Sequence, residues 1–198
     1  MNKIREIIIG TNNEGKYKEI CDLLPNEIKK NSPKELKISS PKEIGKSFEE
    51  NSIIKASYFS KKTNLVCLSD DSGLEINFLN GAPGIYSSRW AGNKNNFDEA
   101  IQKVFKEMSK IKKDWKRKNA AKFICCMTLF WPDGLNYSST GVVKGKISAE
   151  KRGNNGFGYD PIFIPDGFDK TFGEMKPKLK MSIDHRFKAF FKIKKFFN

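Results

Sequence analysis

A buried strand that leads into a glycine-bearing turn and a helix constrains the fold more than any other feature of the sequence. Residues 4–9 end in three consecutive isoleucines and predict a strand, and residues 15–24 space apolar side chains as a helix does before Pro25. The turn between them, Gly10–Tyr17, reads GTNNEGKY and matches the G-x-x-x-x-G-K of a Walker A phosphate loop. Tyr17, however, stands where that loop needs a Ser or Thr hydroxyl for Mg²⁺. The turn is therefore an altered P-loop, a different phosphate-binding turn or a chance match.

Length and composition narrow the class of protein. The 198 residues predict a single domain over 1–198 with enough apolar side chains for a core. The sequence has no apolar run of membrane-spanning length, no signal-peptide pattern and no cysteine framework, so we expect a cytoplasmic protein that does not bind membranes. The net charge of +14 favours polyanionic partners, but most of the excess is lysine, as on a solvated surface. A basic nucleic-acid-binding module stays as an alternative, and we expect no specific nucleic acid.

The rest of the chain mixes strands and helices. Ser47 and Glu50 form a capping box that starts a helix over 48–62, and residues 97–110 and 187–197 predict further helices. Strands are predicted at 65–68, in LEINFL after the SDDSG turn, in KFICCMTLFW and in the returning LNYSSTGVVKGKIS, with a short one at 36–39. Because strands and helices do not alternate strictly, we expect an α/β fold whose sheet is not wholly parallel.

Two groups of residues suggest phosphate and metal chemistry. The turn at 10–17 would direct helix N–H groups, and the side chains of Thr11, Asn12, Asn13 and Lys16, toward an anion; an ordinary Asn- and Gly-rich turn explains it equally well. Asp70 and Asp71 in SDDSG are placed where a strand meets a turn, where a carboxylate can bind Mg²⁺ or take a proton from water. Their likeness to a Walker B motif keeps a P-loop nucleotide kinase or ATPase as an alternative, and an ordinary turn is the plainer explanation.

Three further observations concern a charged helix face, an aromatic loop and a single histidine. Asn51 and Lys55 are four residues apart on one helix face, and Glu43 precedes that helix. The glycine-flanked GFGYD at 156–160 offers aromatic rings that can stack on a nucleobase, although such rings also plug tight loops. KMSIDHR contains the only histidine of the chain, and a lone histidine is usually structural.

Taken together, these segments resemble one family. TNNEGKYKE, SFEENSIIKA, SDDSGLEINFLNGAPGIYSSRWAG, RGNNGFGYDPIF, KTFGEM and KMSIDHR occur in the order found in the inosine triphosphate pyrophosphatase family, which hydrolyses non-standard purine nucleoside triphosphates. The resemblance extends from about residue 7 to about residue 189, nearly the whole chain. It makes GTNNEGKY similar to the family's T-G-N-x-G-K turn, so that Tyr17 is no defect.

The resemblance implies a fold, a reaction and a set of site residues. The fold is a mixed central sheet with flanking helices, in two lobes around a long substrate cleft, usually as a homodimer. The reaction is hydrolysis of ITP, dITP or XTP to the monophosphate and pyrophosphate with Mg²⁺, or Mn²⁺ as a substitute. The implied catalytic residues are Asp71 and Lys55, the metal ligands are Glu43 and Asp71, and the substrate-binding residues are Thr11, Asn12, Asn13, Glu14, Gly15, Lys16, Ser72, Phe157, Gly158, Tyr159, Asp160, Lys180, His185 and Arg186.

Two residues depart from the family's pattern. Asn12 replaces a usual glycine, which limits the turn to conformations that asparagine tolerates. Asp184 stands where the family usually has serine before His-Arg. An ionised carboxylate only accepts hydrogen bonds, so Asp184 would favour purines with an N1–H if it reaches the base; an ion pair at the surface is the alternative.

Overall fold

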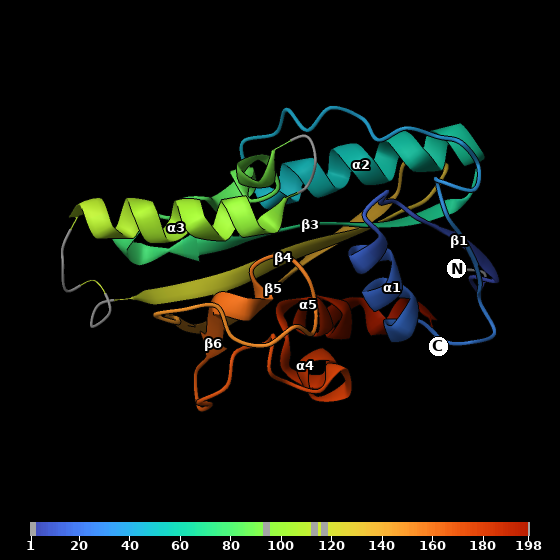
Figure 1. The fold of residues 1–198 in the computed structure, drawn as a ribbon. Helices are drawn as coiled ribbons and strands as arrows, with labels where there is room; N and C mark the ends of the chain where they lie inside the picture. Colours follow the sequence, from blue (N-terminus) through green and yellow to red (C-terminus); the bar gives the residue numbers. More distant parts are fainter. Residues whose placement is uncertain (1–2, 93–95, 112–114, 116–118, 198) are drawn as a thin grey trace. The chain divides into compact units, whose positions relative to one another are not determined.

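The computed structural model describes residues 3–92, 96–111, 115 and 119–197, and these form an α/β fold with a six-stranded sheet (Figure 1). The strands are β1 (Glu6–Ile9), β2 (Lys29–Asn31), β3 (Val66–Ile76), β4 (Ala120–Phe130), β5 (Asn136–Ile147) and β6 (Phe163–Pro165), in the order β2-β1-β3-β4-β5-β6. β1 pairs in parallel with β2 and β3, whereas β5 and β6 are antiparallel. The predicted mixed sheet with flanking helices is confirmed.

Four of the five α-helices in the described residues lie close to their predicted positions, and the fifth, α4, was not predicted. The five are α1 (Glu14–Leu23), α2 (Phe48–Thr63), α3 (Phe97–Ile111), α4 (Pro177–Ile183) and α5 (His185–Ile193). The Ser47 hydroxyl caps α2 by accepting the Glu50 N–H at 3.1 Å, as the capping box predicts. None of the helices in the described part of the chain combines the length and the apolar character that crossing a bilayer requires.

Two predictions about the strands are wrong. The strand expected at 36–39 is absent from the described residues there, and the edge strand β2 lies earlier, at Lys29–Asn31. SDDSG is not a turn between two strands, because β3 runs without a break from Val66 to Ile76. Ion pairs with lysine and arginine neutralise the two aspartates, which allows them to lie inside a buried strand.

The chain forms two compact units, each with its own core. Unit 1 comprises Met1–Asp71, Cys125–Gly141 and His185–Asn198. Within it, α2 covers one face of the strands and α1 and α5 cover the other (Figure 1). The alternation of strand residues explains this arrangement, because Ile8 packs with Phe59 of α2 while Ile7 and Ile9 pack with Ile20 of α1.

Unit 2 comprises Ser72–Ile124 and Val142–Asp184. Its core joins one face of α3 to the strand segments of this unit, through residues such as Val104, Phe123 and Ile147. The loop that carries GFGYD is tied to the same core by Tyr159, which is buried against the edge of the Phe97 ring. The core of unit 2 therefore holds the aromatic loop in position through Tyr159.

Candidate active site

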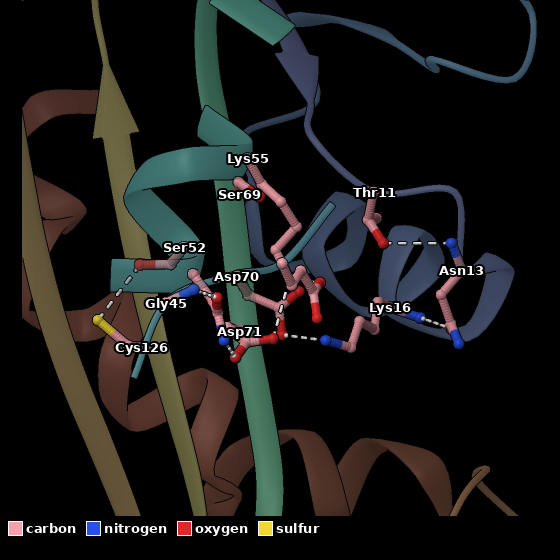
Figure 2. A network of polar contacts seen from close by, with 12 residues as sticks. Thr11, Asn13, Lys16, Gly45, Ser52, Lys55, Ser69, Asp70, Asp71 and Cys126 are labelled. Carbon is pink, nitrogen blue, oxygen red and sulfur yellow. Dashed lines mark hydrogen bonds and ion pairs between the residues drawn. The ribbon is translucent and has the colours of Figure 1, made fainter. Parts of the chain in front are cut away.

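Asp70 and Asp71 point to opposite faces of β3, as neighbours in a strand do. Asp71 faces α2, where it meets Lys55 and Asn51. Asp70 faces α1 and α5, where it meets Lys16 and Arg186. Figure 2 shows Asp70 and Asp71 on β3 between Lys55 and Lys16. The DD pair therefore contributes to two charged sites, one on each side of the strand, which interact electrostatically through Lys16 and Asp71 and through Asp70 and Lys55.

Asp71, Lys55 and Glu43 form the first of these sites. The Lys55 ammonium lies 2.9 Å from Asp71 Oδ1 and 2.6 Å from Glu43 Oε1. The Asn51 amide donates to Asp71 Oδ2 at 3.3 Å, so the predicted shared face of Asn51 and Lys55 is confirmed. Two carboxylates thus converge on a single cation, with Lys55 and Asp71 buried and Glu43 half-buried.

Asn51 also holds the loop that carries Glu43. Its side-chain oxygen accepts the Gly45 N–H at 2.8 Å, while its amide nitrogen binds Asp71. A Cβ atom at position 45 would lie 2.7 Å from that same oxygen, so the close approach requires glycine. One asparagine on α2 therefore fixes the distance between the Glu43 loop and β3.

The charges of this site shift its pKa values. The pKa of the Lys55 ammonium is raised: burial acts to lower it, but Asp71, Glu43 and Asp70 together outweigh burial. Burial raises the pKa of the Asp71 carboxyl, although the ammonium groups of Lys55 and Lys16 oppose that rise. Lys55 thus stays charged, and Asp71 is a stronger proton acceptor than an exposed aspartate.

The phosphate turn offers backbone donors at the start of α1. Asn13 caps the helix by accepting the Lys16 N–H at 2.9 Å, and the Thr11 hydroxyl accepts the Asn13 N–H at 3.2 Å. Within the described residues, the N–H groups of Glu14 and Gly15 have no protein acceptor. They point out of the N-terminus of a ten-residue helix, where an anion is favoured.

The remaining residues of the turn have structural roles. Asn12 is exposed and donates to the Ile38 carbonyl at 3.1 Å and to Ser40 Oγ at 2.9 Å. It is not among the residues with positive φ, so the turn does not need the glycine that it replaces. The exposed Glu14 carboxylate is paired with Lys34. Tyr17 is half-buried in the core of unit 1, where burial raises the pKa of its phenol to about 12, so it packs rather than replacing a P-loop hydroxyl.

The second charged site joins Asp70 to three other side chains. Asp70 Oδ2 lies 3.3 Å from Lys16 Nζ and 3.2 Å from Arg186 Nε. Arg186 also donates from Nη1 to Glu19 Oε2 at 2.6 Å, and the Cys125 thiol lies 3.8 Å from Asp70 Oδ2. Sequence reasoning missed Glu19 and these contacts of Arg186. The only available signal was that Glu19 follows Lys16 by one helical turn.

The aromatic residues of GFGYD are organised around Lys180 in unit 2. The Lys180 ammonium lies 2.8 Å from Asp160 Oδ2 and 5.3 Å from the centroid of the half-buried Phe157 ring. Asp160 also accepts the Phe157 N–H at 2.8 Å, and the buried Tyr159 donates to the Ser87 carbonyl at 2.9 Å. Gly158 has a φ of 68°, which favours glycine. These contacts hold the Phe157 ring and the Lys180 ammonium next to each other in unit 2.

Ser72 lies within β3, whereas Asp184 and His185 lie where α4 ends and α5 begins. Ser72 is half-buried in β3 directly after Asp71. Asp184 is the C-terminal cap residue of α4, with only 1% of its surface exposed, and His185 begins α5 with 3% exposed. The burial of Asp184 removes the basis for an exposed surface ion pair at that position.

Comparisons with known proteins identify the family. The model of the Ham1 family matches residues 7–196. The chain belongs to the Ham1 family. Its relatives include the "dITP/XTP pyrophosphatase" of Zymomonas mobilis, 42% identical over 93% of this chain and 88% of that protein, and the protein of the same name from Bartonella quintana, 41% identical over 94% and 92%.

Solved Ham1 structures agree with this assignment. A HAM1 protein from Coxiella burnetii is 38% identical and has a TM-score of 0.85, with 96% of each chain covered. The Ham1 protein from Staphylococcus aureus is 34% identical and has a TM-score of 0.81, covering 96% of this chain and 97% of that one. The resemblance predicted from the sequence motifs is therefore confirmed along nearly the whole chain.

Proposed function

We propose that this Ham1-family chain hydrolyses non-canonical purine nucleoside triphosphates, namely ITP, dITP and XTP, to the monophosphate and pyrophosphate. Its relatives at about the same length carry the name dITP/XTP pyrophosphatase. The observation that carries the proposal in this chain is the convergence of Glu43 and Asp71 on one buried cation beside a helix N-terminus. Such a site combines carboxylates with donors for a polyphosphate chain.

The donor set fits a magnesium ion. Among the described residues, no three or more His, Cys, Asp and Glu side chains gather as a metal site. Mg²⁺ does not need such a cage, because it is usually held by one or two carboxylates together with substrate phosphates and water. Glu43 and Asp71 would hold it, and the ion would supply charge neutralisation on the phosphates, with Mn²⁺ as a substitute.

The chain's own groups account for the rest of the reaction. The N–H groups of Glu14 and Gly15, with the ammonium groups of Lys16 and Lys55, bind the phosphates. Asp71 accepts a proton from the water that attacks the α-phosphorus. The bond from that phosphorus to the bridging oxygen breaks, and pyrophosphate leaves with the electron pair, so no covalent enzyme intermediate is needed.

The aromatic loop of unit 2 accounts for base selection. Phe157 stacks on the purine, and the Lys180 ammonium is a donor that suits the 6-oxo group of hypoxanthine or xanthine. The 6-amino group of adenine would meet that donor with another donor, which disfavours ATP.

One assay tests the function. Pyrophosphate release is measured with inosine, xanthosine, guanosine and adenosine triphosphates, each with Mg²⁺, with Mn²⁺ and with a chelator. We expect release from ITP and XTP that requires the metal, and little from ATP. Release of orthophosphate, or equal turnover of ATP and ITP, would contradict the proposal. We also propose a homodimer, for which light scattering after size exclusion should give twice the chain mass of 22.6 kDa.

A further inference from the structure

Four charged side chains form a continuous chain of contacts on the α1 and α5 side of β3. Lys16 and Arg186 both bind Asp70 Oδ2, and Arg186 continues to Glu19. The side chains of Asp70 and Arg186 are 0% and 3% exposed, and those of Lys16 and Glu19 are 16% and 18% exposed. The two cations and two carboxylates thus neutralise one another, and the cluster is largely shielded from solvent.

The four residues connect the phosphate turn to two other elements. Lys16 and Glu19 belong to α1, Asp70 to β3 and Arg186 to the first turn of α5. α1 and α5 pack against each other, and Ile20 shares a core cluster with Ala189. Arg186 therefore fastens the first half of α1, including the donors at its N-terminus, to β3 and α5.

The sharing of one oxygen by two cations has a consequence for substrate binding. In the proposed function Lys16 turns to a phosphate, and this removes a cation from Asp70. A fully buried carboxylate without a counter-ion is strongly unfavourable. Because Arg186 remains on the same Oδ2 atom, Asp70 keeps a cation when Lys16 leaves it.

We propose that Arg186 is a positioning residue for the phosphate turn: through Asp70 and Glu19 it holds α1 in place and frees Lys16 for the triphosphate. This inference rests on the proposed function and concerns the phosphate end of the substrate, not the base. Arginine suits the task because Nε and Nη1 reach two different carboxylates at once. A lysine carries its donors on a single nitrogen, which cannot occupy the positions of Nε and Nη1 at the same time.

The test uses a ligand that has no base. Inorganic tripolyphosphate is titrated in the presence of Mg²⁺ by calorimetry, and kcat and KM for ITP are measured on the same preparations. Arg186→Lys keeps the charge but breaks one contact, and Glu19→Gln weakens the anchor on α1 while Arg186 itself stays unchanged. Arg5→Lys and Glu107→Gln make the same chemical changes at a surface arginine and a surface helix glutamate, and serve as controls.

We expect both test variants to weaken tripolyphosphate binding by about tenfold or more, the scale of one lost hydrogen bond to a charged group. KM for ITP should rise more than kcat falls, because the groups that act on the reacting phosphorus are unchanged. The double variant should bind tripolyphosphate about as weakly as the weaker-binding single variant. Both changes break the same chain of contacts, so their effects should not add. The controls should bind as the wild type does.

Three results would overturn the inference. If Arg186 serves the base alone, Arg186→Lys changes the preference for ITP over ATP, and neither Arg186→Lys nor Glu19→Gln alters tripolyphosphate binding. If the network is only structural, both variants melt at lower temperature, yet the folded fraction binds tripolyphosphate normally. If the wild type hydrolyses ITP but does not bind tripolyphosphate, the turn does not hold the phosphates by itself. A wild type that releases no pyrophosphate from ITP would instead contradict the proposed function.

Discussion

At the scale of residues, Asp70 and Asp71 differ in task because they face opposite sides of β3. Asp71 lies with Glu43 and Lys55, and burial favours its acting as a base. We expect Asp71→Asn to lower kcat for ITP by at least about 10²-fold, the lower scale for loss of a general base. Steady-state kinetics measure the effect, and circular dichroism must show an unchanged fold. Near-normal turnover in Asp71→Asn would remove Asp71 from the proposed mechanism.

The raised pKa of Asp71 also predicts how the free energy of unfolding depends on pH. In the unfolded chain this carboxyl loses its proton near the ordinary value of 3.8, whereas burial keeps the folded form protonated to higher pH. Between the two values the folded state binds more protons, so this group's contribution to the free energy of unfolding falls as pH rises. Urea unfolding of the wild type and of Asp71→Asn at several pH values checks this. The stability of the Asn variant relative to the wild type should rise with pH across the window, and a constant difference would contradict the shift.

Several site residues could be predicted from sequence because their signals are local. Ser47 and Glu50 share a capping motif, and Asn51 and Lys55 share a helix face, so short-range spacing was enough. The contact between Arg186 and Glu19 joins residues far apart in the chain, and no periodicity could reveal it. The aromatic rings of GFGYD were recognised from the residues themselves, whereas Lys180 was found only through the family resemblance.

At the scale of elements, α5 packs on the rest of unit 1 through one face only. The sequence predicts that Phe187, Phe190, Phe191 and Phe197 lie near one face of a docked helix, but Phe190 and Phe197 are buried and stacked while Phe191 is 62% exposed. We therefore expect Phe190→Ala to lower the free energy of unfolding by about 3 to 5 kcal/mol through the cavity it leaves.

Phe191→Ala is the matched control on the same helix, and should stay within about 0.5 kcal/mol of the wild type. Urea unfolding followed by circular dichroism measures both variants. Equal losses would show that α5 is turned differently on the core. Stable co-flotation of the wild type with anionic liposomes at physiological salt would show that Phe191 belongs to a membrane-binding face, against the docked helix.

The limits of element prediction have physical reasons. Charged residues such as Asp70 and Asp71 normally end a buried strand, and only their ion pairs with distant residues let β3 continue to Ile76. The strand β2 has the sequence KKN, which carries no apolar alternation, because an edge strand of three residues needs no buried side chain to pair with β1. Long elements with a regular pattern, such as α3 and β4, were predicted close to their observed bounds.

At the scale of the whole molecule, the net charge of +14 should act on the rate of substrate capture. A nucleoside triphosphate is a compact polyanion, and a positive protein attracts it over roughly a Debye length, which is about 30 Å at 0.01 M salt but about 8 Å at 0.15 M. We therefore expect kcat/KM for ITP to fall as salt rises, while kcat at saturating ITP changes little, because the proposed chemistry takes place between buried groups.

The same experiment separates an enzyme with a basic surface from a nucleic-acid-binding module. A surface rich in solvated lysines should bind single-stranded DNA weakly at low salt and lose it by 0.15 M, since each released counter-ion weakens binding as salt rises. Fluorescence anisotropy of a labelled oligonucleotide measures this, with potassium chloride varied as in the kinetic assay. Tight binding that survives 0.15 M salt, together with inhibition of ITP turnover by the oligonucleotide, would mean that the positive charge serves nucleic acid. Loss of DNA binding while ITP turnover persists would mean that the charge serves the small anionic substrate, which is the outcome we expect.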